Sequence, residues 1–359
     1  MKIGIVTPAP PGSRYGNRVT ALRWARILRR LGNTVIIRQT YEGEALDLLI
    51  ALHAHRSFAS IKRFQREHPN TPIIVALTGT DLYGDMGRSS HVCESLDLAT
   101  RIVGLQPSAP DALHPQLREK TRVIYQSVAA LNNKALNDKA RAAAPDHRSS
   151  PSTRMAPRLS SRALDTFDVC VIGHLRPVKD PFRAAIAARM LPASSRVRVI
   201  QIGGAMSEQA DIRARTEMKT NDRYCWLGEQ PAWRVRRILQ RSRLFVLSSR
   251  MEGGANALGE ALVSRIPVLA SRIPGSVGIL GKGYPGYFEV GDTSGLARLM
   301  TVAETDQTFF AELKKHCSRL VPLFDAAREE AAWAKLLGEL FEQARGPGQT
   351  RHSGRGEGR

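Results

Sequence analysis

The chain has 359 residues, enough for two domains of ordinary size, and 42% of them are hydrophobic, as in proteins that bury apolar cores. No apolar run approaches the ~18 residues of a membrane-spanning helix, so the sequence predicts no membrane span. The formal net charge of +20 indicates either a solvated, arginine-rich surface or attraction to anions, and few aromatic residues alternate with the arginines, which weighs against nucleic-acid binding.

The N-terminus and the cysteines bear on the compartment. Residues 1–6 lead directly into a predicted strand, without the regions of a signal peptide. The four cysteines are scattered and lack the CxxC spacing of metal sites. We therefore expect a cytoplasmic protein with reduced thiols, no disulfide, no bound metal and no cofactor.

Short apolar strands and amphipathic helices alternate over residues 2–125, which predicts a parallel sheet with helices on both faces. The predicted strands are residues 2–7, 34–38, 46–52, 72–77, 101–105 and 121–125. The predicted helices are residues 17–31, 57–67, 90–98 and 108–118. In the first helix we expect the inward side chains to be Val19, Leu22, Trp24, Ala25, Leu28 and Leu31.

A rigid loop rich in proline and glycine follows the first strand, at residues 7–18. It lacks the GxGxxG spacing of a dinucleotide site. Its backbone N–H groups, with Arg14 and Arg18, could hold an anion at the carboxyl edge of the sheet. A surface loop with solvated arginines is the equal alternative.

The strand at residues 46–52 ends in a second polar segment, with His53, His55 and Arg56. This position points into a cleft and indicates a binding role. The alternative is a helix capped by Ser57, in which the histidines have no role. A metal site is not expected, because no third ligand stands at a suitable spacing.

The strand at residues 72–77 ends in Thr78, Gly79, Thr80 and Asp81. Asp81 is a candidate general base or hydroxyl acceptor, and an Asx turn is the alternative. Because three successive strand ends carry such residues, we favour a binding site over incidental turns.

The pattern breaks over residues 129–165, where Asn, Lys, Ala, Ser, Arg and Pro dominate. We predict a basic, partly disordered linker there and a disordered tail at residues 345–359. Residues 1–128 would then form the first domain and residues 166–344 the second, including its closing helices.

Strands and helices resume in the second half and predict a second doubly wound domain. The predicted strands are residues 167–172, 196–202, 223–227, 244–247, 268–270 and 287–290. The predicted helices are residues 181–190, 206–218, 231–240, the helix after residue 255, 292–303, 306–318 and 324–342. The cleft between two such domains is the expected ligand site.

Two strand ends of the second domain carry candidate ligand groups. Arg176 and Lys179 follow the strand at 167–172 and suit the diphosphate of a nucleotide leaving group, where negative charge develops during transfer. A capped helix with exposed basic residues is the alternative. Near Leu227 the backbone could pair with a base edge, with a structural turn as the equal alternative.

The stretch at residues 248–270 reads as a strand end, a tight turn, a helix and a further strand. Gly253 and Gly254 permit the turn, and Asn256 can cap the helix. The free N–H groups of such a helix start suit a phosphate, while Glu252 and Glu260 suit the hydroxyls of a sugar or ribose. The combination predicts a sugar nucleotide.

These motifs resemble the GT-B glycosyltransferases of the large retaining family that includes glycogen-synthase-like and sucrose-synthase-like enzymes. Glu252 and Glu260 match that family's two glutamates eight residues apart, and Lys179 matches the lysine of its "GRLxxxKG" turn. His174 stands where the family has arginine, so either His174 or Arg176 takes the usual diphosphate-binding role.

A closer resemblance is to the selenosugar synthases of selenoneine biosynthesis. It rests on residues 7–21, 51–57, 77–83 and 172–181, blocks that span both predicted domains. The resemblance implies transfer of the sugar of a UDP-sugar, UDP-N-acetylglucosamine or UDP-glucose, to selenophosphate, with release of UDP and then loss of phosphate. It leaves open the donor sugar, the anomeric outcome and the oligomeric state.

The predicted site falls into three groups of residues. Those expected to act in catalysis are Glu252, Arg176, Lys179 and Asp81. Those expected to bind the donor are His174, Gly253, Gly254, Ala255, Asn256, Ala257, Glu260, Leu227 and Gly12. Those expected to bind the acceptor are Arg14, Asn17, Arg18, His53, His55, Arg56, Thr78, Gly79 and Thr80.

Three other functions fit parts of the sequence. One is a GT-B glycosyltransferase that acts on a cell-envelope sugar or a small thiol. Another is a binder of nucleic acid or anionic membrane built on a retired transferase scaffold, against which the two intact glutamates argue. The third is a nucleotide-sugar epimerase of the same fold.

Overall fold

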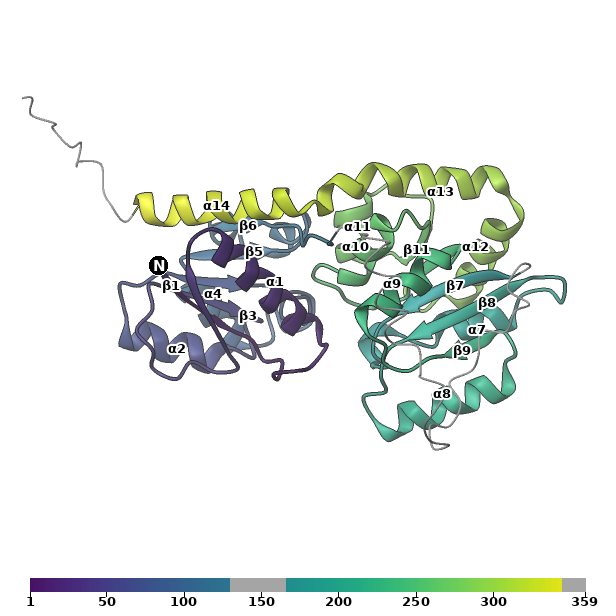
Figure 1. Cartoon of the computed structure of the whole chain (residues 1–359), viewed down its shortest axis with the longest axis horizontal. Coiled ribbons are helices and arrows are strands. Elements are labelled where there is room, and N and C mark those ends of the chain that lie inside the picture. Colours follow the sequence, from purple (N-terminus) through teal and green to yellow (C-terminus); the bar gives the residue numbers. More distant parts are fainter. Residues whose placement is uncertain (130–165, 344–359) are drawn as a thin grey trace, which may run out of the picture.

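The computed structural model describes residues 1–129 and 166–343. Figure 1 shows two α/β domains side by side, joined along one edge by the last helices of the chain. Apart from residue 129, the predicted linker lies outside the described residues, as does the predicted tail.

The first domain contains a sheet of the order β2-β1-β3-β4-β5-β6, in which every pairing is parallel. Its central strands are buried along their whole length because helices cover both faces. The strands are β1 (Lys2–Val6), β2 (Thr34–Arg38), β3 (Leu48–Leu52), β4 (Ile73–Ala76), β5 (Arg101–Gly104) and β6 (Thr121–Val123). The helices are α1 (Gly16–Arg30), α2 (Phe58–Glu67), α3 (Thr80–Tyr83), α4 (Ser90–Leu98), η1 (Pro110–Ala112) and α5 (Pro115–Glu119).

The second domain repeats the scheme with a parallel sheet of the order β12-β11-β10-β7-β8-β9. The strands are β7 (Phe167–Ile172), β8 (Val197–Ile202), β9 (Tyr224–Trp226), β10 (Leu244–Leu247), β11 (Val268–Ser271) and β12 (Tyr287–Phe288). The helices are η2 (Pro177–Lys179), α7 (Arg183–Arg189), α8 (Glu208–Thr220), α9 (Ala232–Arg241), α10 (Asn256–Val263), α11 (Pro274–Leu280), α12 (Thr293–Thr305), α13 (Gln307–Leu320), η3 (Val321–Phe324) and α14 (Ala326–Gln343). Two doubly wound domains were predicted, and this is confirmed.

One detail of the predicted core is wrong. Val19 and Leu22 of α1 were expected to point inward, but they are 37% and 44% exposed. The buried stripe instead runs through Ala21, Trp24 and Leu28, at the three- and four-residue spacing of one helix face. Val19 and Leu22 lie off this stripe, so their apolar character does not reflect burial.

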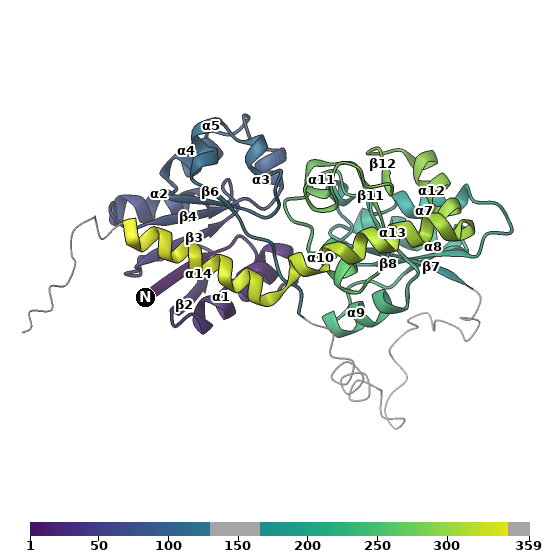
Figure 2. The same cartoon turned by 90° about the horizontal axis from the view of Figure 1, so that it is seen from above.

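The last helix, α14, belongs in space to the first domain. Trp333, Leu336 and Leu340 of α14 lie in one apolar cluster with Trp24 and the strands of the first sheet. Figure 2 shows α14 crossing over the first domain while α13 lies over the second. The predicted domain boundary groups this helix with the second domain, whereas its apolar face completes the core of the first.

Each sheet has a point at which the strand order reverses, and such points favour ligand binding at the carboxyl ends of the strands. In the first sheet β1 lies between β2 and β3, and in the second β7 lies between β10 and β8. The loops that carry the predicted site residues follow β1, β3, β4, β7, β9 and β10. In the described part of the chain, no helix combines the length and apolarity needed to cross a membrane.

Candidate functional site

Two helices from different domains begin at the same place. α1 starts at Gly16 and α10 at Asn256, and a Cβ at Gly16 would lie 3.9 Å from the side-chain amide nitrogen, Nδ2, of Asn256. The helix starts therefore face each other across the domain boundary. Each has a positive dipole end, so together they form a region suited to an anion.

Neither helix start is closed by its own side chains. The N-cap residues are Tyr15 and Ala255, and neither makes a side-chain cap hydrogen bond. The predicted cap, Asn256, is instead the first residue of α10, so that expectation is wrong. No acidic residue stands in either first turn. Within the described chain no acceptor is found for the first-turn N–H groups of Gly16, Asn17, Arg18, Asn256 and Ala257.

The loop before α1 contacts the second domain. Arg14 pairs with Glu229 at 3.4 Å, and both side chains are about half exposed. The Tyr15 ring stands edge-on to the His174 imidazole, with the ring centres 5.5 Å apart. Gly12 has a positive φ of 78°, which turns the loop before these contacts. The Nε atom of Arg18 is buried and has no hydrogen-bond partner among the described residues.

Lys179 and Glu252 form an ion pair in the second domain. The Lys179 ammonium donates to Glu252 Oε1, which also accepts a hydrogen bond of 2.6 Å from the Ser249 hydroxyl. Ser248 joins the two segments again, because its hydroxyl donates to the Asp180 carbonyl at 2.9 Å. The predicted diphosphate turn and the predicted sugar-binding glutamate thus lie together.

His174 and Arg176 differ in the hydrogen bonds that their side chains already make. His174 accepts a hydrogen bond of 3.2 Å at Nδ1 from the Gly204 amide, which leaves Nε2 available as a donor. Arg176 is exposed, and its side chain has no partner within residues 1–129 and 166–343. Either side chain can therefore still contact a ligand.

The turn after β10 meets the loop after β4 at backbone distance. A Cβ on Gly79 would lie 2.6 Å from the Gly253 amide nitrogen, and one on Gly253 would lie 2.5 Å from the Thr78 carbonyl carbon. Gly254 is as tightly placed, with 2.5 Å from such a Cβ to Leu105 of the first domain. Glycine at these positions is what allows the two domains to approach beside Glu252.

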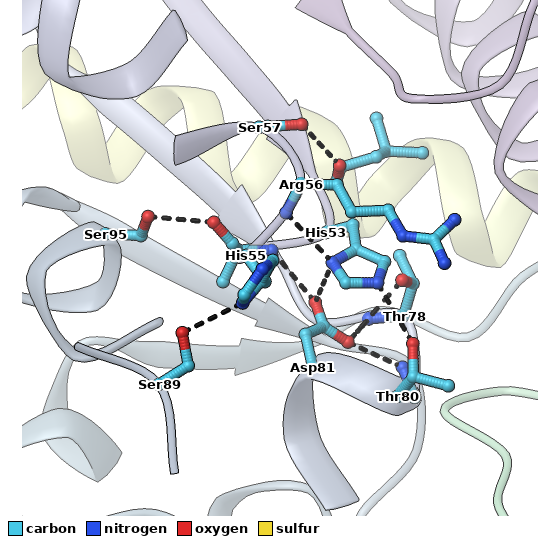
Figure 3. Close-up of polar contacts among 12 residues, drawn as sticks. His53, His55, Arg56, Ser57, Thr78, Thr80, Asp81, Ser89 and Ser95 are labelled. Atoms are coloured by element: carbon cyan, nitrogen blue, oxygen red, sulfur yellow. Dashed lines mark hydrogen bonds and ion pairs between the residues drawn. The ribbon is translucent and has the colours of Figure 1, made fainter. Parts of the chain in front are cut away.

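Asp81 organises the loops of the first domain (Figure 3). Its carboxylate is fully buried and accepts hydrogen bonds from the amides of Ala54, Thr78 and Gly79 at 3.0, 2.8 and 2.8 Å. A carboxylate used in this way holds backbone in place. The geometry therefore favours a positioning role for Asp81 over direct contact with a ligand.

His53 lies between Asp81 and Thr80. Its Nε2 atom is 3.0 Å from the Thr80 hydroxyl, and its Nδ1 atom accepts a hydrogen bond of 3.4 Å from the Arg56 amide. Burial lowers the pKa of His53, an effect that the Asp81 carboxylate partly offsets. His53 also has a positive φ of 75°, uncommon for a residue with a side chain, so the turn is held by its surroundings.

His55 and Arg56 point differently. His55, in the loop between β3 and α2, contacts the Ser89 hydroxyl at 2.8 Å (Figure 3). It also lies near the His91 ring, so its contacts are with the start of α4. Arg56 is exposed at the same strand end. Ser57 does not cap α2 with its side chain, because its hydroxyl donates to the Leu52 carbonyl at 2.7 Å.

Glu260 lies one turn into α10, where the domains pack together. Burial raises its pKa, and the nearby Arg236 and Arg23 oppose that rise. Arg23 comes from α1 of the first domain and donates to the Asn256 side-chain carbonyl at 3.0 Å. No sequence pattern distinguishes Arg23 from the other arginines of α1.

The backbone of Leu227 is already engaged. Its N–H donates to the Gln201 carbonyl at 2.9 Å, and its carbonyl accepts from the Gln230 side chain. The turn therefore has a structural function, and an additional contact with a base edge would have to share the carbonyl.

The structure thus brings most predicted residues to one interdomain region and leaves His55 and Leu227 in structural contacts. It adds Tyr15, Arg23, Glu229, Arg236 and Ser249, which sequence patterns did not indicate. Among the described residues, no group of three or more His, Cys, Asp and Glu side chains is placed to hold a metal ion.

Comparison with known proteins places this site in context. Residues 158–319 match the family described as "Glycosyl transferases group 1". HepE of Anabaena, solved with UDP, superposes with a TM-score of 0.71 at 14% identity, covering 94% of this chain and 99% of HepE.

Two further structures are similar over almost their whole length. Sucrose-phosphate synthase of Thermosynechococcus elongatus has a TM-score of 0.72 at 14% identity, with 95% of this chain and 99% of that protein covered. A glycosyltransferase of Rickettsia africae has a TM-score of 0.64 at 13% identity, with 95% and 98% covered. At these identities the likeness shows the fold alone.

Proposed function

We propose that this chain, which has the GT-B fold, is a glycosyltransferase and, more narrowly, a selenosugar synthase, which transfers the sugar of a UDP-sugar to the selenium of selenophosphate. The donor is UDP-N-acetylglucosamine or UDP-glucose. HepE, which has the same fold, has been solved with UDP and with UDP-glucose, and this supports a uridine nucleotide as the carrier.

The observation that carries the proposal is the meeting of the α1 and α10 helix starts, with first-turn N–H groups lacking acceptors in the described chain and no acidic residue in either turn. Most acceptors of glycosyl transfer are neutral hydroxyl groups, which do not need two dipole ends. A reaction that unites an anionic acceptor with an anionic leaving group does need them.

In this proposal the second domain holds the donor. Lys179 and the start of α10 take the diphosphate, with His174 and Arg176 beside them, and Glu252 accepts hydrogen bonds from the sugar hydroxyls. The ion pair between Lys179 and Glu252 supports the assignment, because it places a cation for the diphosphate directly beside an acceptor for the sugar hydroxyls.

The first domain holds selenophosphate. The amides at the start of α1, together with Arg18, are the anion donors, and His53 and Thr80 follow the adjacent strands β3 and β4. Because burial lowers the pKa of His53, the imidazole stays neutral at neutral pH and can donate only through one nitrogen. Arg14 and Arg56 are exposed and can fold toward the anion when it arrives.

The chemistry needs no general base. Selenophosphate carries a nucleophilic selenium at neutral pH, so the protein has to orient it toward the anomeric carbon. The C–Se bond forms as the bond between that carbon and the UDP oxygen breaks, and the electron pair leaves with UDP. Water then cleaves the P–Se bond, which gives the selenosugar and phosphate.

The test is a UDP-release assay with a panel of UDP-sugars, with and without selenophosphate. We expect UDP release that depends on selenophosphate and a product in which selenium is bound to the anomeric carbon by mass spectrometry and NMR. UDP release that stays at the level without selenophosphate, but rises with a sugar or thiol acceptor, would replace this proposal by an ordinary glycosyltransferase. NMR of the anomeric centre also decides between inversion and retention.

A further inference from the structure

Four polar side chains from three helices meet at the domain interface behind the helix starts: Arg23 on α1, Arg236 on α9, and Asn256 and Glu260 on α10. Arg23 is the one contributed by the first domain. Asn256 and Glu260 are four residues apart and so share one face of α10, and the Arg23 side chain reaches that face at Asn256. The charged neighbours of Arg23 are Glu329, Glu260, Arg26 and Arg236. Glu329 already accepts hydrogen bonds from Trp24 and Ser127.

Each of the two arginines in this cluster has a buried guanidinium nitrogen without a hydrogen-bond partner among the described residues. Arg23 donates from Nη2 to Asn256 at 3.0 Å, while its Nη1 is enclosed and has no hydrogen-bond partner among the described residues. The Nε atom of Arg236 is in the same situation. Enclosed guanidinium N–H groups without acceptors are costly, so they are usually found where an acceptor arrives.

Glu260 complements them. No hydrogen bond or ion pair of its carboxylate is found in the described parts of the chain, although Arg23 and Arg236 both lie close enough to shift its pKa. A carboxylate needs hydrogen-bond donors, and the two guanidinium groups need acceptors. The cluster therefore lacks a group that can both donate and accept.

A vicinal diol meets this need, because each hydroxyl can donate to Glu260 and accept from an arginine. A phosphate fits poorly, since it offers no donor to Glu260 and adds negative charge beside a buried carboxylate. Ribose carries a vicinal diol at its 2′ and 3′ positions, whereas deoxyribose does not.

We propose that Arg23 of the first domain binds the ribose diol of the donor together with Glu260, and so sets the preference for ribonucleotides over deoxyribonucleotides. This inference rests on the proposed UDP-sugar donor. It makes the donor site a product of both domains, since an arginine of the acceptor domain completes it.

Calorimetric binding of UDP and of 2′-deoxy-UDP tests the inference without any acceptor or turnover. We expect the wild-type protein to bind UDP about 10- to 100-fold more tightly, as for hydrogen bonds to charged groups. In Arg23→Met the preference should fall below about threefold, with most of the loss in UDP affinity. Arg23→Lys keeps the charge but loses the paired N–H donors of the guanidinium group, so its preference for UDP should lie between those of the wild type and Arg23→Met. It provides the test if the methionine variant does not fold.

The matched control is Arg26→Met, an exposed arginine one turn along the same helix. It should keep the wild-type preference. An unchanged preference in Arg23→Met, with both ligands weakened equally, would mean that Arg23 only holds the domains together. Wild-type protein that binds both ligands equally would overturn this inference alone, whereas absence of UDP binding would overturn the proposed donor as well. Failure of selenophosphate to react would leave the inference standing.

Discussion

Lys179 and Glu252 neutralise each other in the unliganded protein, and this has a consequence for catalysis. In the proposed donor complex the Lys179 ammonium, which has three N–H donors, would divide them between the diphosphate and Glu252 Oε1. We propose that the donor diphosphate draws Lys179 away from Glu252, whose carboxylate, held by Ser249 at 2.6 Å, then accepts hydrogen bonds from the sugar hydroxyls. In this proposal the ion pair is a resting arrangement that the substrate replaces.

We expect Glu252→Gln and Lys179→Met each to lower kcat by about 100-fold or more, the size of losing a charged group that acts on the transition state. The measurement is the UDP-release assay at saturating substrates. Lys282→Met, an exposed lysine outside the site, is the control and should keep wild-type activity. Loss of less than about threefold in both site variants would remove the pair from the catalytic machinery.

Ser249→Ala tests whether the hydroxyl only positions Glu252. We expect kcat to fall about 3- to 10-fold with little change in KM for the donor, because one neutral hydrogen bond is worth about 1 kcal/mol. A rise in KM without a change in kcat would instead indicate that Ser249 contributes to binding.

We expect the Glu260 carboxylate to lower the stability of the unliganded protein while it contributes to binding of the donor. Burial raises its pKa, so between the unfolded and folded pKa values the folded state binds more protons, and stability falls as pH rises through that window. Glu260→Gln has no charge to bury, so it should raise the Tm of the unliganded protein at about pH 8, and the gain should vanish near the ordinary glutamate pKa of about 4.3.

Thermal unfolding of wild type and Glu260→Gln across that pH range is the measurement, with UDP binding measured beside it. The variant should be more stable yet bind UDP more weakly. A variant less stable than wild type at all pH values would show that the carboxylate stabilises the fold through Arg23 and Arg236.

At the scale of whole elements, the close approach of two loops determines how the domains close. Gly253 and Gly79 leave no room for a side chain between the turn after β10 and the loop after β4. These loops belong to different domains, which we propose to bind the acceptor and the donor, so a change that separates them should affect transfer more than binding of the donor alone.

Gly253→Ala should therefore lower kcat at least tenfold while UDP affinity changes less than threefold, because its Cβ would lie 2.5 Å from backbone of the opposite domain. Gly283→Ala is a matched control, since no atom lies within 4 Å of the Cβ position there. The measurements are kcat and the affinity for UDP, the latter by calorimetry, for both variants. Equal losses of affinity and kcat in Gly253→Ala would mean that the substitution disturbs the second domain itself and not its contact with the first.

The elements also show what the sequence could predict. Strand ends after β1, β3, β4, β7 and β10 were identified as site loops, because apolar strands followed by polar residues are a local pattern. The interdomain contact of Arg23 and the backbone contacts of Asp81 were not predicted from the sequence. Their functions depend on contacts with residues far away in the chain, and such contacts leave no periodic signal. Likewise the apolar spacing of α14 predicts a helix but cannot tell which domain it covers.

At the scale of the whole molecule, Glu329 ties three parts of the chain together. Its carboxylate accepts from the Trp24 indole at 2.9 Å, and from the amide and hydroxyl of Ser127 at 2.8 and 2.5 Å. Trp24 belongs to α1, and Ser127 to the segment that leaves the first domain. A buried carboxylate with these donors fixes the returning helix against the first domain.

Glu329→Ala should lower the free energy of unfolding by about 2–4 kcal/mol, since it leaves several buried donors without an acceptor. Urea denaturation followed by tryptophan fluorescence reports this, because Trp24 is directly affected. Glu330→Ala is the control: its partner Arg30 is a surface residue, so about 0–1 kcal/mol is expected. Equal losses in the two variants would contradict the special role of Glu329.

The return of α14 to the first domain also matters during synthesis on the ribosome. Residues 1–129 emerge first, but Trp24 and its neighbours remain uncovered until residues 326–343 have followed. The first domain should thus stay open to proteases and chaperones during most of translation. A nascent chain stalled before residue 326 would expose the apolar surface that α14 covers in the complete protein. The first domain can therefore complete its core only after the second domain has been synthesised.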